Sequence, residues 1–325
     1  MVKAIVVHEF GGPEVLKWEE VAVGDPGPGQ ARIKHEAIGL NFVDVYFRTG
    51  LYKPADGLPF VPGSEGAGTV AAVGPDVTNV RPGDRVSYHG PAGSYAEERL
   101  VPADRLIRVP EDIDLRTAAA MTLKGLTAQF LLRQTFPVKE GHTILFHAAA
   151  GGVGSIACQW ANHLGATVIG TVGSEEKAEI ARGNGCHHVI NYRTENFVER
   201  VAEITGGRKC DVVYDSVGRD TYPGSLDCLK QLGMWVLFGQ SSGTVQNFDL
   251  NLLAQKGSLF ATRPTLFTYA AKRESLEKMA AELMDVVKNG HVKIAVKQEF
   301  PLKDAAEAHR ALEGRRTTGA TVLVP

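Results

Sequence analysis

The stretch HTILFHAAAGGVGSIACQWANHLGATVIGTV (142–172) decides the fold. An apolar run leads into a turn of small residues, a helix-like segment follows, and a second apolar run closes the unit. Ala149, Gly151 and Gly154 take the first, third and sixth positions of a G-x-G-x-x-G frame. Small residues let the backbone approach a pyrophosphate, whose charge the first N–H groups of the helix can hold. We therefore expect a dinucleotide site here, and the alternative is a tight turn without a ligand.

The end of the second apolar run indicates which dinucleotide binds. An NAD enzyme usually has an Asp or Glu at this point to hold the ribose 2′-hydroxyl. This chain has Gly173 and Ser174 instead, followed by Lys177, so small groups and a cation face the adenosine ribose. NADP(H) is favoured, although the adjacent Glu175 and Glu176 weaken the argument.

The pattern on either side of this unit predicts two domains of different kinds. Before position 117 short strand-like runs are separated by Gly and Pro, as expected for a β-barrel-like domain. From 117 onward strand-like and helix-like segments alternate, which implies right-handed βαβ crossovers and a parallel sheet. The fold class is therefore α/β, a Rossmann-type doubly wound sheet together with a β-rich domain.

Composition excludes several classes of partner. Lys and Arg number 35 against 37 Asp and Glu, a net charge of −2, so no basic field is present to gather nucleic acid or anionic lipid. The start, MVKAIVVHEFGG, lacks the pattern of a signal peptide, and no stretch has 18 apolar residues in a row. The four cysteines lie far apart and form no metal or disulfide pattern. We expect a cytoplasmic protein with a small-molecule ligand and no membrane contact.

The whole chain resembles the zinc-less quinone oxidoreductases of the medium-chain dehydrogenase/reductase superfamily. The motifs that carry the resemblance are GGPEVL (11–16), AIGLNFVDVYFRTGLY (37–52), PGSEGAG (62–68), GDRV (83–86), LKGLTA (123–128), FHAAAGGVG (146–154), NYR (191–193), VVYDSVG (212–218) and KGSLFATRPTL (256–266). The family signature runs on through Gln159 and departs mildly at Asn162, where a basic or small polar residue is usual.

The resemblance implies a GroES-like catalytic domain of residues 1–125 and 266–325, a Rossmann domain of residues 126–265, NADPH as cofactor and a homodimer. It places Asn41, Tyr46 and Thr127 near the nicotinamide, with Tyr52 close by. These four are the catalytic candidates. The cofactor-binding positions implied are Asn41, Phe42, Tyr46, Thr127, Phe130, Gly151, Gly152, Val153, Gly173, Ser174, Lys177, Tyr192, Ser216, Phe238, Gly239, Ser241, Arg263 and Arg315.

No metal site is expected. Related alcohol dehydrogenases have a catalytic Cys where this chain has Asn41 and a His where it has Ser64, and residues 91–110 contain no Cys for a structural zinc lobe. A catalytic zinc usually needs three protein ligands and acts as a Lewis acid on an alkoxide. Without it, an acceptor whose reduced form spreads its negative charge is favoured, such as a quinone or an enone. Tyr46 or Tyr52 could donate a hydrogen bond to that acceptor.

Two alternative functions remain open at this stage. An NADPH-dependent 2-alkenal or alkenone reductase would share the fold and the absence of zinc. A non-catalytic protein that binds NADPH or AU-rich RNA belongs to another class, and the net charge of −2 argues against the RNA form.

Overall fold

The computed structural model describes residues 1–325, which form two compact units. The first unit consists of Met1–Lys124, Lys272–Ala281 and Ile294–Pro325, and the second of Gly125–Ala271 and Glu282–Lys293. Two long helices contribute residues to both units, α2 (Leu115–Phe130) and α9 (Arg273–Lys288). Each unit has its own sheets and its own hydrophobic core.

The second unit is built on a six-stranded parallel sheet with the order β10-β9-β8-β11-β12-β13. Its strands are β8 (Thr143–Phe146), β9 (Thr167–Val172), β10 (His188–Asn191), β11 (Cys210–Asp215), β12 (Leu229–Leu237) and β13 (Phe260–Thr262). The chain moves outward from β8 to β10 and then returns to place β11 on the other side of β8. This reversal between β8 and β11 is the switch point where doubly wound sheets bind their ligands.

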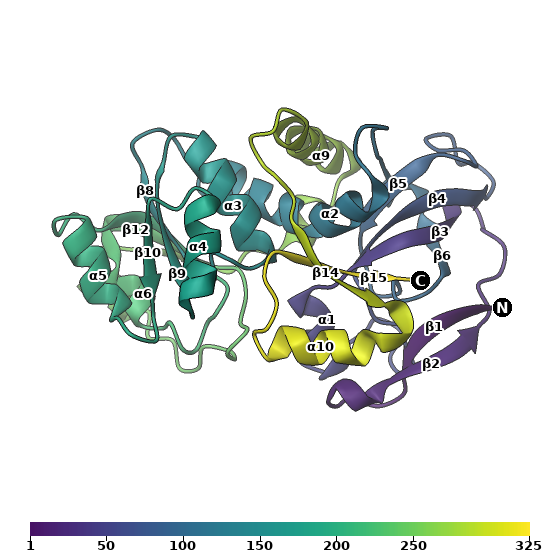
Figure 1. Ribbon diagram of the computed structural model, residues 1–325, viewed down its shortest axis with the longest axis horizontal. Coiled ribbons are helices and arrows are strands. Elements are labelled where there is room, and N and C mark those ends of the chain that lie inside the picture. Colours follow the sequence, from purple (N-terminus) through teal and green to yellow (C-terminus); the bar gives the residue numbers. More distant parts are fainter. The chain divides into compact units, whose positions relative to one another are not determined.

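Helices cover both faces of this sheet. In Figure 1, α3 (Gly152–His163) and α4 (Glu175–Gly183) lie on one face, and α5 (Phe197–Ile204) and α6 (Gly224–Asp227) lie on the other. The core under α5 and α6 joins Leu145, Ile169 and Val213 of the strands to Val201 and Leu226 of the helices. Further segments of this unit are the π-helical turn η3 (Leu131–Thr135), α7 (Asn251–Gln255) and α8 (Leu266–Tyr269).

The first unit contains a seven-stranded mixed sheet and a separate two-stranded one. The larger sheet has the order β14-β15-β3-β4-β5-β7, with β6 also paired to β3. Its strands are β3 (Gln30–Gly39), β4 (Glu65–Val73), β5 (Arg85–His89), β6 (Glu98–Pro102), β7 (Ile107–Arg108), β14 (Val296–Pro301) and β15 (Ala320–Val324). The smaller sheet pairs β1 (Val2–Val7) with β2 (Leu16–Val21) in antiparallel fashion.

Short helices complete the first unit. They are α1 (Phe42–Arg48), α10 (Ala305–Glu313) and the 3-10 turns η1 (Pro13–Val15), η2 (Ala103–Arg105) and η4 (Leu302–Asp304). Residues of β3 alternate between buried and less buried positions before the strand becomes wholly buried at its end. That end delivers the chain to α1, so β3 fixes where α1 begins.

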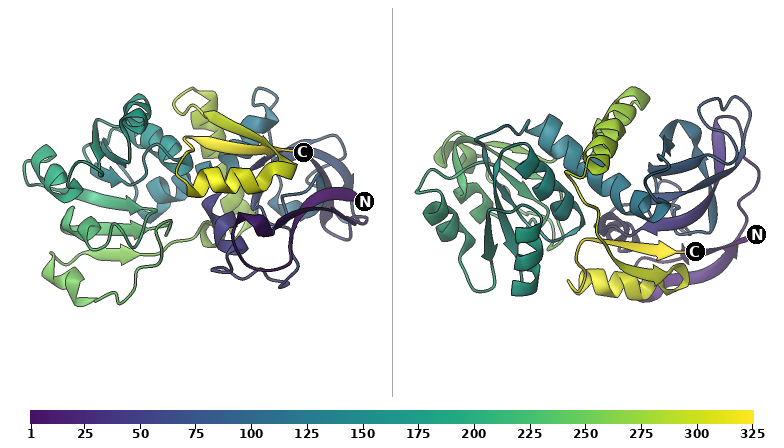
Figure 2. Two further views of the ribbon diagram at one scale, coloured as in Figure 1. Left: turned by 60° about the horizontal axis from the view of Figure 1, so that its bottom comes forward. Right: turned by 45° about the horizontal axis from the view of Figure 1, so that its top comes forward.

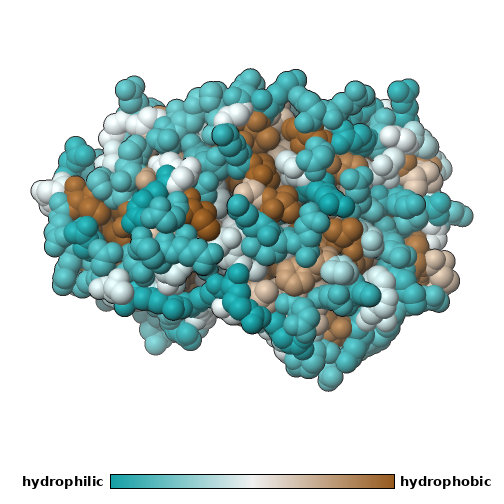
Figure 3. Space-filling model, viewed as in Figure 1, coloured by the Kyte–Doolittle hydropathy of each residue, from teal (hydrophilic) through white to brown (hydrophobic).

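The predicted fold class is confirmed, since a parallel Rossmann-type sheet is joined to a β-rich unit. The views in Figure 2 show the same division into sheets and helices along the chain. Hydrophilic residues dominate the face drawn in Figure 3, and apolar residues lie on it in separate patches. None of the helices has the length and apolar character needed to cross a membrane.

Candidate functional site

The turn between β8 and α3 has the shape of a phosphate cradle. Ala148 has a φ of 56°, a left-handed conformation that a residue with a side chain rarely adopts. A Cβ on Gly154 would lie 2.4 Å from the carbonyl oxygen of Ala148 and 2.8 Å from the Cα of Ala149, so only glycine fits there. The helix then begins at Gly152, after Gly151 as its N-cap. The first N–H groups of α3 are therefore exposed to any anion at the turn.

The chain has a glycine rather than an acidic residue at position 173, directly after β9. A Cβ on Gly173 would lie 2.5 Å from the hydroxyl oxygen of Tyr192, which stands over this glycine. Ser174 is the N-cap of α4 and accepts a hydrogen bond from the backbone N–H of Lys177 at 3.3 Å. Gly173, Ser174, Lys177 and Tyr192 thus lie near one another at the end of β9.

Two further predicted segments lie against each other at the ends of β11 and β12. A Cβ on Gly239 would lie 2.7 Å from the carbonyl oxygen of Ser216, and the N–H of Ser241 donates to that same oxygen at 3.1 Å. Phe238 follows β12 and its ring centroid lies 5.7 Å from that of Phe146, the last residue of β8. These residues therefore line the same edge of the sheet as the phosphate cradle.

A buried carboxylate holds this edge in shape. Asp215, at the end of β11, has no solvent exposure. Its Oδ1 accepts from the backbone N–H groups of Val217 and Gly218 at 2.9 and 3.1 Å. Its Oδ2 accepts from the hydroxyl of Ser225 at 2.8 Å and from the indole N–H of Trp235 at 3.2 Å. The hydroxyl of Thr221 also lies within 2.9 Å of both oxygens. Asp215 is therefore a hub that sets the path of the loop carrying Ser216.

The other predicted residues of this unit and of the C-terminus are more scattered. Phe130 is 1% exposed and stacks on Tyr269 with a centroid distance of 4.6 Å, so it is part of a core. Thr127, on α2, is also buried, and Arg263 follows β13 and donates to the carbonyl of Pro264 at 3.4 Å. Arg315 belongs to the first unit, where it follows α10 with a φ of 57°.

In the first unit the predicted aromatic residues gather around α1. The centroid distances are 5.8 Å between Phe42 and Tyr46, 5.2 Å between Tyr46 and Tyr52, and 5.8 Å between Phe47 and Tyr52. The backbone N–H of Tyr52 also donates to the carbonyl of Tyr46 at 3.0 Å. Asn41 is the N-cap of the same helix, and it forms a capping box with Asp44. Asn41, Phe42 and Tyr46 thus lie on or at the start of α1, and Tyr52 packs against them from the segment that follows.

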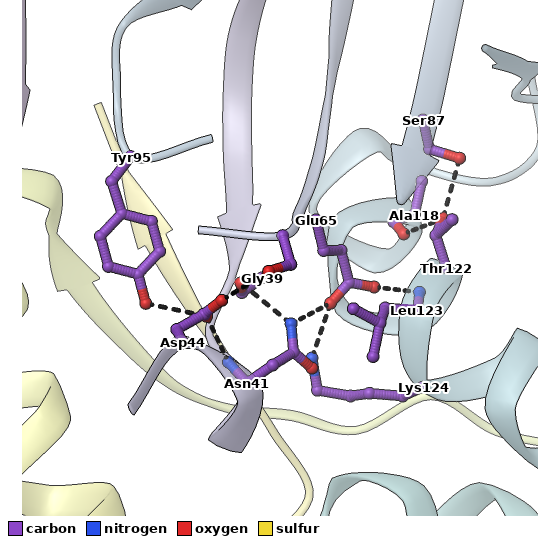
Figure 4. Close-up of polar contacts among 11 residues, drawn as sticks. Gly39, Asn41, Asp44, Glu65, Ser87, Tyr95, Ala118, Thr122, Leu123 and Lys124 are labelled. Atoms are coloured by element: carbon purple, nitrogen blue, oxygen red, sulfur yellow. Dashed lines mark hydrogen bonds and ion pairs between the residues drawn. The ribbon is translucent and has the colours of Figure 1, made fainter. Parts of the chain in front are cut away.

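Asn41 also joins a buried charged cluster, drawn in Figure 4. Its side-chain amide donates to Oε2 of Glu65 at 2.8 Å, and the ammonium of Lys124 donates to the same oxygen at 2.8 Å. The backbone N–H of Leu123 donates to the other oxygen, Oε1, at 2.6 Å. Glu65 is fully buried and the Lys124 side chain is 5% exposed. A complete ion pair is therefore enclosed next to Asn41.

Asp44 is the centre of a second set of contacts in the same unit (Figure 4). Its carboxylate accepts from the N–H of Asn41 at 2.9 Å, the hydroxyl of Ser64 at 3.0 Å and the hydroxyl of Tyr95 at 3.1 Å. Burial raises the pKa of Asp44 to about 6, partly offset by these hydrogen bonds and by the charge of Lys124. Burial likewise raises the pKa of Tyr95 far above its usual range. Asp44 can therefore change charge near neutral pH.

The contacts continue from Tyr95 to the last helix. Nε2 of His309 lies 3.0 Å from the Tyr95 hydroxyl, and Nδ1 lies 3.0 Å from Nη1 of Arg48. A guanidinium can only donate, so Nδ1 accepts and the proton of the neutral ring is on Nε2. Arg48 also binds both carboxylate oxygens of Glu313, at 2.7 and 2.8 Å. The donors therefore run in one direction, from Arg48 through His309 and Tyr95 to Asp44.

Several residues of this cluster were not predicted from the sequence. Lys124 and Glu65 occur in the LKGLTA and PGSEGAG motifs without a predicted role, and Ser64 marks only the place where a zinc ligand is missing. A signal was present, because Lys124 is the one cation within the apolar run TAAAMTLKGLTAQ (117–129). Tyr95 and His309 carried no such signal, because they meet only through the pairing of distant segments.

Comparison with known proteins agrees with this architecture. A family model described as the alcohol dehydrogenase GroES-like domain matches residues 27–111, and one described as zinc-binding dehydrogenase matches residues 152–285. A quinone oxidoreductase from Pseudomonas aeruginosa is 52% identical over 326 residues, covering all of both chains. A 2-haloacrylate reductase from Burkholderia is 50% identical, covering all of this chain and 99% of the relative. The structure of Escherichia coli quinone oxidoreductase complexed with NADPH superposes with a TM-score of 0.97 at 48% identity, over 99% of this chain and 100% of that one.

A GroES-like unit joined to a Rossmann unit with a small-residue phosphate turn defines a medium-chain dehydrogenase/reductase. Within that superfamily the chain belongs to the quinone oxidoreductase family, as the identity over the full length of its relatives shows.

Proposed function

We propose that this protein is an NADPH-dependent quinone reductase. The observation that carries the proposal is the identity of about half of all positions with named quinone oxidoreductases over the full chain. The local structure supports it, because the second unit has the small-residue turn after β8 and a glycine beside Tyr192 after β9. In this proposal the first unit carries the catalytic residues and the second unit binds the cofactor.

The residues present fit NADPH on the evidence of their own geometry. A Cβ would fill the cradle at Gly154, which keeps the backbone accessible to a pyrophosphate. Gly173 beside Tyr192 leaves out the carboxylate that would repel a 2′-phosphate, and Lys177 lies in the first turn of α4. When bound, the cofactor would supply a hydride. The chain's own part is to bind it, to hold the acceptor beside it and to exclude water.

The remaining site residues are assigned as follows. We place Asn41, Tyr46 and Thr127 at the nicotinamide and Tyr52 at the acceptor. The pyrophosphate would meet Gly151, Gly152 and Val153. Phe42, Phe130, Ser216, Phe238, Gly239, Ser241, Arg263 and Arg315 would complete the cofactor contacts.

Reduction of activated alkenes is a second candidate function, because a 2-haloacrylate reductase is 50% identical to this chain. Both reactions add a hydride to an electron-poor acceptor whose reduced form carries a delocalised negative charge. The two candidates are separated by comparing kcat/KM for 1,4-benzoquinone with kcat/KM for 2-chloroacrylate and a simple enone. We expect the quinone to be preferred by at least tenfold, and a preference for the alkene would reverse the assignment.

The cofactor assignment has its own test. Gly173→Asp would place a carboxylate where Tyr192 now stands, and Lys177→Ala would remove the nearby cation. We expect both variants to bind NADPH at least tenfold more weakly while NADH affinity changes much less, measured by fluorescence titration without an acceptor. Glu176→Gln on the same helix is the matched control. If NADPH affinity and NADH affinity fell equally, positions 173 and 177 would not distinguish the 2′-phosphate from the 2′-hydroxyl.

Assembly and location complete the proposal. Strand β13 is an edge strand, paired only to β12, and its residue Phe260 is 55% exposed. We propose that two copies pair through this edge to form a homodimer, and that the protein acts in the cytoplasm. Light scattering on the wild type and on Phe260→Asp tests the dimer, since a charge at the edge should give a monomer.

A further inference from the structure

Two cations are buried in the first unit, and they differ in how their donors are used. Arg48 is 1% exposed, and its N–H groups bind Glu313, His309 and the carbonyl of Gly11. Lys124 is 4% exposed, and the structure gives its ammonium a single hydrogen bond, to Glu65. An ammonium carries three donors, so two of its N–H directions are left for another oxygen.

The position of the ammonium is fixed by its surroundings. Glu65 is held at Oε1 by the backbone N–H of Leu123 and at Oε2 by the amide of Asn41, so the carboxylate cannot turn away from Lys124. Figure 4 shows Lys124 extending from its helix to end beside Asn41 and Glu65. A cation held rigidly in a site shielded from water acts on a nearby charge more strongly than one in water.

A buried ion pair needs a reason beyond stability. The desolvation of two charges offsets most of their attraction, and apolar residues of the same volume often stabilise a core equally well. Here the pair is enclosed beside Asn41, the residue that the proposed function places at the nicotinamide. Asn41 stands where related alcohol dehydrogenases carry a catalytic Cys, so the oxygen of Glu65 that binds the ammonium also binds the residue at that position.

The proposed reaction creates the charge that such a cation would stabilise. A quinone accepts two electrons and one hydrogen as hydride from NADPH, which becomes NADP⁺, and a proton from water completes the hydroquinone. Between these steps one former carbonyl oxygen carries a negative charge.

We propose that the ammonium of Lys124 faces the carbonyl oxygen of the acceptor and stabilises the negative charge that this oxygen gains during reduction. This inference rests on the proposed function, and it assigns the role that a Lewis acid has in the zinc enzymes to a side chain of the protein. Glu65 and Asn41 are then positioning residues, which hold the ammonium in place.

The experiment compares four forms of the full chain. Lys124→Met removes the charge but leaves Glu65 buried without its cation, so it can fail to fold for a trivial reason. The double variant Lys124→Met, Glu65→Gln removes both charges and keeps one oxygen to accept from the backbone N–H of Leu123, while its NH₂ group faces the amide of Asn41. Lys34→Met, at an exposed position of β3, is the control for loss of a lysine elsewhere in the unit.

The first measurement needs no turnover. A nitrophenol that absorbs visible light only when ionised is bound to each form in the presence of NADP⁺, and its ionisation is followed with pH. We expect the wild type and Lys34→Met to lower the pKa of the bound phenol by about one to three units relative to water, because a cation stabilises the phenolate. The double variant should lose this shift. A shift retained in the double variant would overturn the proposal.

The second measurement is kcat/KM with quinones of graded reduction potential. Loss of one oxyanion-stabilising donor lowers the rate by about 10²- to 10³-fold in other enzymes. We expect a loss of this size for the double variant with electron-rich quinones and a smaller loss with electron-poor ones, which need less help. An equal loss across the series would indicate a merely structural role. A wild type that reduces no quinone would overturn the proposed function, while the phenol measurement would still report on Lys124.

Discussion

Two of the buried carboxylates, one from each unit, are bound by different kinds of group. Glu65 in the first unit and Asp215 in the second both have no solvent exposure. Glu65 forms an ion pair with the ammonium of Lys124, with a distance of 2.8 Å between Oε2 and Nζ. Asp215 is bound only by neutral groups, which are two backbone N–H groups, two hydroxyls and an indole N–H.

The difference separates a structural group from one suited to chemistry. The donors of Asp215 come from the loop that follows β11, from α6 and from β12, so the carboxylate folds that loop and has little capacity left for a ligand. The Glu65 cluster instead holds a cation whose donors are only partly used. Asp215, met by neutral donors, fixes a loop, whereas Glu65, met by a cation, holds that cation beside Asn41.

The largest effect on stability is expected for Asp215→Asn, which tests whether Asp215 holds the loop after β11 in place. The amide NH₂ would face groups that themselves donate, either Ser225 and Trp235 or the backbone of Val217 and Gly218. Each buried donor left without an acceptor costs about 1–3 kcal/mol, so we expect a loss of about 3 kcal/mol or more in the free energy of unfolding.

Urea unfolding measures this loss, and NADPH affinity should fall with it because Ser216 lies on the loop. Asp220→Asn is the matched control, since Asp220 is exposed in the same loop. If both variants were equally stable, the hub described for Asp215 would be wrong.

The first unit should show the stronger dependence on pH. Burial and the charge of Arg48 lower the pKa of His309 to about 3. Its folded pKa lies below the unfolded value of about 6.5, so the unfolded chain binds more protons and stability falls as the pH drops below 6.5. Asp44 acts in the opposite sense, because its pKa is raised to about 6 and its protonated form is favoured in the fold. It therefore offsets part of the loss between about pH 6 and pH 4.

His309→Gln isolates the histidine contribution. The Gln oxygen can accept from Arg48 and its NH₂ can donate to Tyr95, so the contacts remain while the titration is removed. Between pH 7.5 and pH 5 the wild type should lose about 2 kcal/mol more than this variant, because one pKa unit corresponds to about 1.4 kcal/mol. The midpoint of urea unfolding at several pH values gives the answer, with His8→Gln at the surface as control. Parallel pH profiles for wild type and variant would contradict the assignment.

The sequence predicts the fold of the second unit better than the residue cluster of the first unit. The second unit follows from local sequence, because the small residues at 149–154 and the alternation of strands and helices each depend on neighbouring residues. The fold class was predicted on this basis and is confirmed. The cluster in the first unit joins β3, β4, α1, α2 and α10, and residues such as Arg48 and His309 are 261 positions apart. No local pattern reports such a meeting, so Asn41 was predicted through the family resemblance and its charged neighbours were not.

The smallest effect on the free energy of unfolding is expected for an ion pair between oppositely charged side chains at the surface. Arg116 and Glu299 in the first unit lie 3.3 Å apart, but their side chains are 49% and 44% exposed, so water already solvates both charges. Glu299→Gln should change the free energy of unfolding by less than about 0.5 kcal/mol, and added salt should remove even that difference. A double-mutant cycle with Arg116→Gln measures the pair directly. A coupling of several kcal/mol would mean that burial does not distinguish this pair from Lys124 and Glu65, and the contrast between exposed and enclosed charges would lose its basis.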